Sequence, residues 1–302
     1  MKSALAIGTF DGVHLGHRAV IAAARAAAGK HGRVTAVTFW PHPMTVFDSA
    51  GAPPLLLSLD AREDALLAAG ADEILLLHFT PELAGLSPAE FVGRVVAPLE
   101  PTAAAVGENF TFGARGVGAP ATLAKLSAGR FAVLTAPLIE VGGQAVSSTA
   151  IRAAVTGGDV TLAGRLLGRD FSVRGPVVRG DQRGRTIGFP TANLTPDDAI
   201  VSPADGVYAG WLRRLDGGRS GEPMPAAVSV GDNPTFGSSR RVEAYVLDAD
   251  FDIYGVPVEI GFTKRLRGMV TYPSVEDLVA QMRQDVEDTR RLVRWRYGDS
   301  FS

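Results

Sequence analysis

Predicted strands and helices alternate regularly through the first half of this 302-residue chain. Of all the features of the sequence, this alternation limits most strongly which folds the chain can adopt. Short apolar or β-branched runs predict strands, and alanine- and leucine-rich runs predict helices. The predicted strands are residues 5–8, 34–39, 73–79, 103–107 and 131–136. The predicted helices are residues 18–28, 61–69, 88–98, 123–128, 149–156 and 160–167. Such alternation is typical of a parallel sheet covered by helices on both faces, so we predict an α/β domain over residues 1–168.

The pattern changes near residue 170, where short alternating segments are separated by glycine, proline and aspartate. The predicted strands are residues 171–178, 206–213, 226–230, 241–247 and 257–262. This spacing predicts an antiparallel β-barrel domain over residues 169–302. One helix follows the strands: Ser274 is placed to cap it, with Asp277 three residues on. Apolar residues then recur at helical spacing, namely Val275, Leu278, Val279, Met282 and Val286.

The composition excludes several classes of function. The chain has no cysteine, which rules out disulfides, thiolate catalysis and cysteine-ligated zinc. Its net charge of -2 gives no bulk attraction to nucleic acid or to a membrane surface. No apolar run approaches the roughly 20 residues of a membrane span. The N-terminal residues lack a basic region followed by a long apolar core, so we do not expect secretion. We therefore expect a cytoplasmic protein that acts on small molecules, either as a monomer or as a homo-oligomer.

Residues 8–17, GTFDGVHLGH, join the first predicted strand to the first predicted helix. A glycine turn before a helix N-terminus is a ready anion site, because unpaired N–H groups and the helix dipole face it. His14 and His17 add side-chain donors to the same place. In open parallel sheets, ligands bind at the carboxyl ends of strands, where this turn lies. The pattern indicates polyphosphate chemistry, although two exposed loop histidines would be the simpler interpretation of HxGH alone.

Over this ten-residue signature the chain resembles the nucleotidylyltransferase superfamily, and most closely the flavin adenylyltransferase module of bacterial bifunctional riboflavin kinase/FAD synthetases. The resemblance implies a Rossmann-like α/β fold for the first domain. It also implies that His14 and His17 bind ATP phosphates and stabilise the departing pyrophosphate. Gly8, Phe10 and Asp11 then belong to the same ATP- and flavin-binding segment.

Two more segments of the first half resemble this family. Residues 107–113, GENFTFG, follow a predicted strand and place Asn109 toward the ATP/flavin pocket, although a turn with core aromatic residues would have the same composition. Residues 38–43, TFWPHP, resemble a second family segment. His42 in that segment either fixes a loop or belongs to the site.

Residues 147–152, SSTAIR, place hydroxyl groups at a predicted helix start. Ser147, Ser148 and Thr149 would serve as ordinary helix caps, but Arg152 within one turn adds a cation beside them. The segment resembles the family's SSTxxR motif, which implies a phosphate clamp. Ala150 is a departure, because relatives often carry arginine there.

The second half has its own signature over residues 175–193, GxVxxGxxxGRxxGFPTAN, in which glycines and arginines suit close approach to phosphates. A solvated basic hairpin would share this composition, but the ordered series resembles riboflavin kinase throughout. The resemblance implies that Thr191 and Asn193 hold Mg²⁺ and the ATP phosphates. It places Gly180 and Arg185 in the ATP/flavin site. Hydroxyl and amide oxygens suit this hard cation.

A kinase needs a base near the hydroxyl that it phosphorylates. Glu243 resembles the family's catalytic glutamate, although an exposed strand glutamate is the commoner explanation of any single Glu. Alternation would place Glu243 with Tyr245 and Leu247 on the inner face of the barrel. The family also suggests a flavin-side role for Arg267.

These resemblances cover nearly the whole chain and predict a bifunctional enzyme. Its second domain phosphorylates riboflavin to FMN with ATP, and its first domain adenylylates FMN to FAD and releases pyrophosphate, with Mg²⁺ serving both. Two alternatives stay open: a riboflavin kinase whose first domain is a scaffold, and a non-enzymatic flavin carrier or sensor. His14, His17 and Arg152 argue against the first alternative, and Glu243 and Thr191 against the second.

Overall fold

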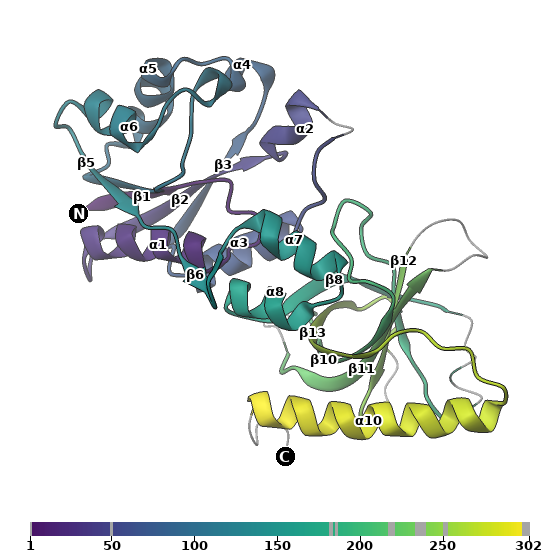
Figure 1. Cartoon of the computed structure of the whole chain (residues 1–302). Coiled ribbons are helices and arrows are strands. Elements are labelled where there is room, and N and C mark those ends of the chain that lie inside the picture. The colour runs from purple at the N-terminus through teal and green to yellow at the C-terminus, as the bar shows by residue number, and fades with distance from the viewer. Residues whose placement is uncertain are drawn as a thin grey trace. The chain divides into compact units, whose positions relative to one another are not determined.

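The computed structural model describes residues 2–48, 51–180, 184, 187–216, 221–232, 240–249 and 253–297. The chain divides into two compact units, Met1–Ser148 and Thr149–Ser302. Figure 1 shows the α/β elements in purple to teal and the barrel in teal to yellow-green. Each unit has its own sheet and helices.

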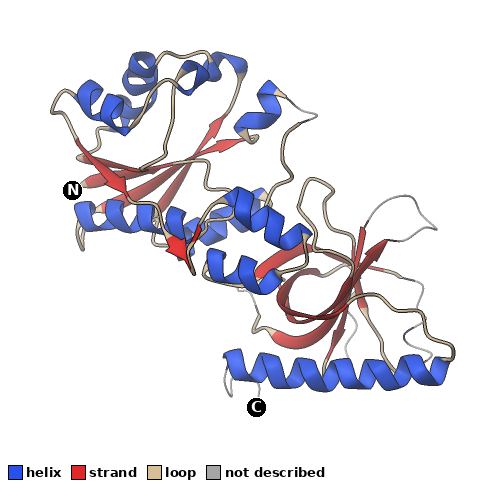
Figure 2. Ribbon diagram, viewed as in Figure 1, coloured by secondary structure: helices blue, strands red, loops and turns tan. Residues whose placement is uncertain are grey.

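The first unit contains a five-stranded parallel sheet of order β3-β2-β1-β4-β5, as the alternation predicts. Its strands are β1 (Ser3–Ile7), β2 (Arg33–Trp40), β3 (Glu73–His78), β4 (Ala103–Gly107) and β5 (Ala132–Ala136). Helices lie on both faces of this sheet (Figure 2). The strand order reverses between β1 and β4, so the turn after β1 lies at a switch point of the kind that binds ligands in open α/β sheets.

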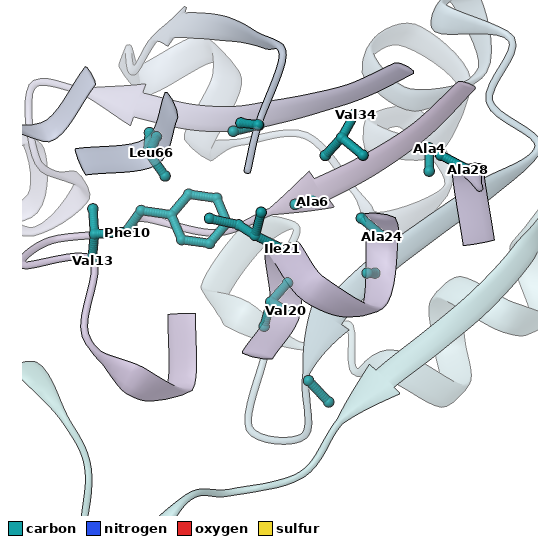
Figure 3. Close-up of a cluster of buried hydrophobic side chains, with 14 of the residues drawn as sticks. Ala4, Ala6, Phe10, Val13, Val20, Ile21, Ala24, Ala28, Val34 and Leu66 are labelled. Atoms are coloured by element: carbon teal, nitrogen blue, oxygen red, sulfur yellow. The ribbon is translucent and has the colours of Figure 1, made fainter. Parts of the chain in front are cut away.

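Successive side chains of β1 point to opposite faces and so enter two separate cores. Ala4 and Ala6 pack in one core with residues of α1 (Leu15–Ala28) and α3 (Leu59–Ala68), as Figure 3 shows. The alanines are small, which lets these helices approach the sheet closely. Leu5 and Ile7 pack in the other core with α6 (Pro120–Ser127) and the helical stretch that begins at Pro88.

The predicted helix over residues 88–98 exists, but as three consecutive pieces. It begins as α5 (Pro88–Phe91), widens to the π-helix η1 (Val92–Val96) and ends as the 3₁₀-helix η2 (Ala97–Leu99). Pro98 lacks a backbone N–H, and Glu100 adopts a left-handed φ of 46°, so the helix stops there. Short elements that the periodicity does not reveal are α2 (Pro43–Phe47), α4 (Pro81–Ala84), η3 (Ala114–Gly116) and the hairpin β6 (Glu140–Val141) and β7 (Gln144–Ala145).

The second unit contains a closed barrel of order β10-β11-β12-β9-β8-β13, in which neighbouring strands are antiparallel. Its strands are β8 (Phe171–Val178), β9 (Ala192–Leu194), β10 (Gly206–Arg214), β11 (Met224–Asp232), β12 (Arg240–Val246) and β13 (Pro257–Arg267). The barrel prediction is confirmed. Strand β9 was not predicted from the sequence, because three residues are too few to show a periodicity.

Among the described residues, the second unit includes the helices α7 (Ser148–Thr156), whose first residue still belongs to the first unit, α8 (Val160–Leu167) and α10 (Val275–Tyr297). Helix α8 packs against β8 and β13, and α10 packs against β10, β11 and β13. The predicted cap of α10 is present, since the backbone N–H of Asp277 donates to Ser274 Oγ at 3.1 Å. Within the described ranges, no helix is long and apolar enough to cross a membrane.

Candidate active sites

The turn after β1 brings two histidine rings face to face at the start of α1. The ring centroids of His14 and His17 lie 3.5 Å apart with their planes 16° apart. His14 caps the helix, because its Nδ1 accepts a hydrogen bond of 3.3 Å from the backbone N–H of His17. The proton of the neutral His14 ring therefore sits on Nε2. A Cβ at Gly16 would lie only 3.2 Å from the His14 ring, so the glycine at this position leaves room for the ring.

A pocket of roughly 530 Å³ opens beside this turn, within the size range of small-molecule sites. The residues predicted from the sequence that line it are Gly8, Phe10, His14, His17, Asn109, Ser147 and Ser148. The fold thus gathers segments that are far apart in the sequence at the carboxyl ends of the parallel strands. Imidazole, amide and hydroxyl groups of this kind are suited to bind phosphate oxygens.

The same pocket has an aromatic part that the sequence analysis misses. Phe39 and Phe79 meet edge to face at 5.7 Å, and Phe47 packs on Phe79 at 6.0 Å. All three line the pocket, and Phe47 remains 64% exposed. The available signal in the sequence was Phe47, an aromatic residue that closely follows the TFWPHP segment. The pocket therefore combines polar groups for phosphates with apolar surface for ring systems.

His42 fixes a loop and also lies at the wall of the pocket, and its part in ligand binding stays a prediction. Its Nδ1 accepts a hydrogen bond of 3.2 Å from the backbone N–H of Met44, which caps α2, and its side chain also lines the pocket. Asn109 follows β4 in a turn closed by the bond from Phe110 N–H to Gly107 O at 3.0 Å. A Cβ at Gly107 would approach Asn109 Oδ1 to 3.2 Å, so glycine leaves the amide space.

Asp11 does not line this pocket, contrary to the expectation of a ligand contact. Its carboxylate is 1% exposed and accepts hydrogen bonds of 3.0 and 3.2 Å from the backbone N–H of Leu56. Its carbonyl oxygen accepts a bond of 2.9 Å from Ser148 Oγ. Asp11 therefore holds the turn in place from behind. Thr149 and Arg152 follow in α7, in the second compact unit, and their part in a phosphate clamp stays a prediction.

The predicted kinase residues meet where β9 pairs with β12. Glu243 lies opposite Asn193 in the strand register. Thr191 Oγ1 donates to Glu243 Oε2 at 3.3 Å, and Arg241 Nη1 lies 3.5 Å from Glu243 Oε1. Asn193 Nδ2 donates to the carbonyl oxygen of Thr191 at 3.2 Å. Hydroxyl, amide and carboxylate groups are thus brought into one cluster.

The prediction that Glu243 points to the inner face of the barrel is wrong. The buried face of β12 carries Val242, Ala244 and Val246, whereas Glu243 and Tyr245 lie on the alternate, partly exposed face. The side chain of Glu243 is 35% exposed. A charged group in the barrel core would lose its hydration without adequate compensation, so the apolar set faces inward and the carboxylate faces the site.

The geometry around Asn193 fits a hard cation. Asn193 is 5% exposed, and its Oδ1 is buried with no hydrogen-bond partner in the described part of the chain. Because Nδ2 donates to Thr191, Oδ1 keeps its lone pairs for a ligand. A Cβ at Gly180 would lie 2.4 Å from this oxygen, so only glycine fits there. Among the residues described, no group of three or more His, Asp or Glu side chains could hold a metal.

A pocket of roughly 200 Å³ adjoins this cluster beneath α10. Thr191, Glu243 and Arg267 line it. The sequence analysis misses its other lining residues, among them Phe189, Ser229, Tyr245, Met269, Met282 and Asp285. Ser229 lies directly opposite Glu243 in the strand register, and a serine in an apolar strand was the available signal.

Arg267 is held by a carboxylate of α10. Its Nη2 donates to Asp285 Oδ2 at 2.7 Å, and Asp285 is only 4% exposed. Burial by itself would lower the pKa of Arg267, but the hydrogen bonds and charge of Asp285 outweigh it and raise that pKa. Arg267 is therefore a permanent cation at the wall of the pocket. Arg185, also predicted from the sequence, lies outside the described residues.

The chain matches two family models, one for each half. The model for FAD synthetase matches residues 1–150, and the model for riboflavin kinase matches residues 167–293. Among curated proteins, the bifunctional riboflavin kinase/FMN adenylyltransferase of Listeria monocytogenes is 37% identical over 294 residues, which is 96% of this chain and 92% of the relative. The proteins of the same name from Bacillus subtilis and Escherichia coli K12 are 33% and 35% identical, over 96% and 93% of this chain and 92% and 90% of their own lengths.

A solved structure also resembles the whole chain. The crystal structure of a Streptococcus pneumoniae protein named macrolide-efflux protein aligns with a TM-score of 0.86 at 34% identity. The alignment covers 96% of this chain and 94% of that protein. The likeness therefore includes both the α/β unit and the barrel.

Proposed function

The chain belongs to the family of bifunctional riboflavin kinase/FMN adenylyltransferases, and from that premise we propose which pocket carries each reaction and which side chains act in it. The enzyme phosphorylates riboflavin to FMN and then adenylylates FMN to FAD. Both family models match, and the relatives share a bifunctional name, which supports two activities over a kinase with a scaffold domain or a flavin carrier. ATP as co-substrate of both steps supports a cytoplasmic location.

We assign adenylylation to the pocket beside the histidine turn. A phosphate oxygen of FMN attacks the α-phosphorus of ATP, the bond to the β-phosphate oxygen breaks, and pyrophosphate leaves. The FMN phosphate is already an anion, so this step needs alignment and charge neutralisation more than a base. His14 and His17, at the positive end of α1, are suited to stabilise the departing pyrophosphate, and Asn109 and Ser147 to orient the substrates.

We assign phosphorylation to the pocket beneath α10. Glu243 accepts the proton of the ribityl 5′-hydroxyl, that oxygen attacks the γ-phosphorus of ATP, and ADP leaves. Thr191 Oγ1 and Asn193 Oδ1 would hold Mg²⁺, which when bound neutralises phosphate charge. Arg267, fixed by Asp285, supplies a cation on the flavin side.

The observation that carries this proposal is the contact of Thr191 Oγ1 with the Glu243 carboxylate at 3.3 Å, beside the unpaired Asn193 Oδ1. The direct test incubates the pure protein with riboflavin, ATP and Mg²⁺ and separates riboflavin, FMN and FAD by chromatography. We expect both FMN and FAD. FMN alone would indicate the scaffold alternative, and bound but unchanged riboflavin would indicate a carrier.

A further inference from the structure

Arg62 on α3 is the largest completely buried side chain among the residues described, with an exposure of 0%. A buried guanidinium is uncommon, because its loss of hydration must be offset by well-placed partners. An apolar side chain in the same place would not carry this cost. The partners of Arg62 therefore indicate why a cation is present.

Those partners belong to the ends of the two strands that border the adenylylation pocket. Arg62 Nη1 donates to the carbonyl oxygens of Thr9 at 3.3 Å and Phe39 at 3.4 Å. Arg62 Nη2 lies 3.6 Å from Asp11 Oδ1, and the guanidinium lies 5.3 Å from the centre of the Trp40 ring. A planar guanidinium reaches several acceptors at once, and Arg62 thereby joins the histidine turn to the end of β2.

The turn that Arg62 holds has an unfavourable backbone. Phe10 and Val13 adopt positive φ angles of 50° and 41°, a region that side-chain-bearing residues rarely occupy. Both side chains are 1% exposed and point into the core under the sheet (Figure 3). Residues with such φ angles persist only where the surrounding structure holds them firmly in place, and they cluster at functional sites. Thr38 Oγ1 gives Thr9 O a second donor at 3.0 Å.

The two strained residues lie in the segment that leads to His14, so the backbone path here sets where both imidazoles lie. We infer that Arg62 is a positioning residue of the adenylylation reaction: from behind the turn it fixes the Thr9 carbonyl and the Asp11 carboxylate, and thereby holds His14 and His17 toward the phosphates. This inference rests on the proposed function of the pocket. Arg62 does not line that pocket, so it would act through the turn.

The alternative is that Arg62 merely contributes to stability, and steady-state kinetics separate the two roles. Arg62→Met keeps the length of the side chain and removes every donor. A displacement of about 1 Å at a reacting group costs on the order of 10²-fold in rate. We therefore expect kcat for FMN adenylylation to fall by about that factor, while KM for ATP and for FMN changes far less. The riboflavin kinase rate of the same preparation should not change.

Leu123→Ala is the matched control. Leu123 is 0% exposed in the core on the other face of the same sheet and does not line the pocket. This variant should unfold at a lower temperature yet keep the wild-type kcat while it is folded. A normal adenylylation kcat in Arg62→Met would overturn the inference. An equal loss of kcat in Leu123→Ala at the same folded fraction would also overturn it.

Arg62→Lys covers the case in which the methionine variant does not fold. Lysine keeps the charge but has a single nitrogen, so it cannot contact Thr9 and Phe39 with one group and Asp11 with another, as Nη1 and Nη2 of the guanidinium do. We expect a folded protein with a reduced adenylylation kcat and a normal kinase rate, and a fully active lysine variant would contradict the positioning role. FAD synthesis by the wild-type protein in the same assay tests the proposed function separately.

Discussion

His14 and His17 form a stacked pair that is joined by a hydrogen bond from the backbone N–H of His17 to His14 Nδ1 at 3.3 Å. This bond caps α1 and at the same time leaves Nε2 of His14 as the proton-bearing nitrogen. One contact therefore both begins the helix and prepares a donor at its positive end. The pair is the feature on which the adenylylation assignment most depends.

We predict that His17→Ala removes FAD formation and spares FMN formation. The variant loses one donor aimed at the leaving pyrophosphate, which typically costs on the order of 2.7–4 kcal/mol of transition-state stabilisation. The measurement compares FMN-to-FAD and riboflavin-to-FMN rates in one preparation. Arg18→Ala is a suitable control, since Arg18 is exposed next to His17 and does not line the pocket. Equal loss of both activities in His17→Ala would contradict the assignment.

We predict that Glu243→Gln lowers kinase turnover by roughly 10²–10⁴-fold, because the amide cannot accept the proton of the ribityl hydroxyl. Riboflavin binding should survive, and FAD formation from supplied FMN should continue. The decisive measurement is the kinase rate at saturating riboflavin. Glu222→Gln, at an exposed position of the same barrel, controls for the change of charge. A near-normal rate in Glu243→Gln would remove this carboxylate from the mechanism.

We predict that Gly180→Ala damages the kinase site without unfolding the barrel. The new Cβ would lie 2.4 Å from Asn193 Oδ1 and displace the oxygen that is proposed to bind Mg²⁺. The kinase rate should fall by about 10²-fold, and the Mg²⁺ concentration for half-maximal rate should rise. Gly231→Ala is the control, because its nearest non-neighbouring atom would be 4.0 Å away. An unchanged Mg²⁺ dependence would count against Asn193 as a ligand.

We predict that Glu259 makes the stability of the barrel depend on acid pH. Burial would raise the pKa of Glu259, but Arg174, Arg213 and the Ser172 hydroxyl outweigh it and hold this pKa below the ordinary 4.5. The unfolded chain then binds the proton more readily than the folded protein does. The stabilisation that the ionised Glu259 gives to the folded barrel is therefore complete above about pH 4.5 and is lost as the pH falls through the folded-state pKa.

The change Glu259→Gln tests this dependence. At neutral pH the free energy of unfolding of the variant should fall by about 1–3 kcal/mol, since two partly buried arginine side chains lose their charged hydrogen-bond partner. Below pH 4.5 the unfolding midpoint of the variant should fall less steeply than that of the wild type. Parallel curves for the two proteins would show that Glu259 does not titrate with unfolding.

We predict that a fragment beginning at residue 149 forms a more stable barrel than one beginning at residue 169. The longer fragment keeps α8, which packs on β8 and β13, and keeps the bond from Thr161 Oγ1 to Thr263 O at 3.2 Å. Loss of these contacts should lower the free energy of unfolding by at least the roughly 1.5–3 kcal/mol that burial of one apolar side chain contributes. Thermal unfolding and FMN formation of both fragments provide the measurement. Equal midpoints would favour the domain boundary at residue 168.

Local patterns in the sequence were sufficient to predict the α/β unit and the barrel, and the motifs indicated a minority of the residues that line the two pockets. Strand and helix periods are properties of neighbouring residues, and the glycine turn before α1 carries its anion-binding groups within ten residues. The Ser274 cap of α10 is a contact of this short range as well. Short elements such as β9 escape prediction, because three residues do not establish a period.

Only the tertiary structure decided which way three polar side chains face. Glu243 lies outside the buried face of β12 because the barrel closes with Val242 and Ala244 inside. Asp11 turns from the pocket to Leu56, 45 residues away in the sequence. Arg62 reaches Thr9 across 53 residues. The sequence by itself determined the secondary-structure elements and the chemical groups of the sites. Burial and hydrogen bonding between distant segments decided which of these groups face a ligand and which hold the backbone. The reason is that the free energy of a buried polar group depends on partners that only the fold supplies.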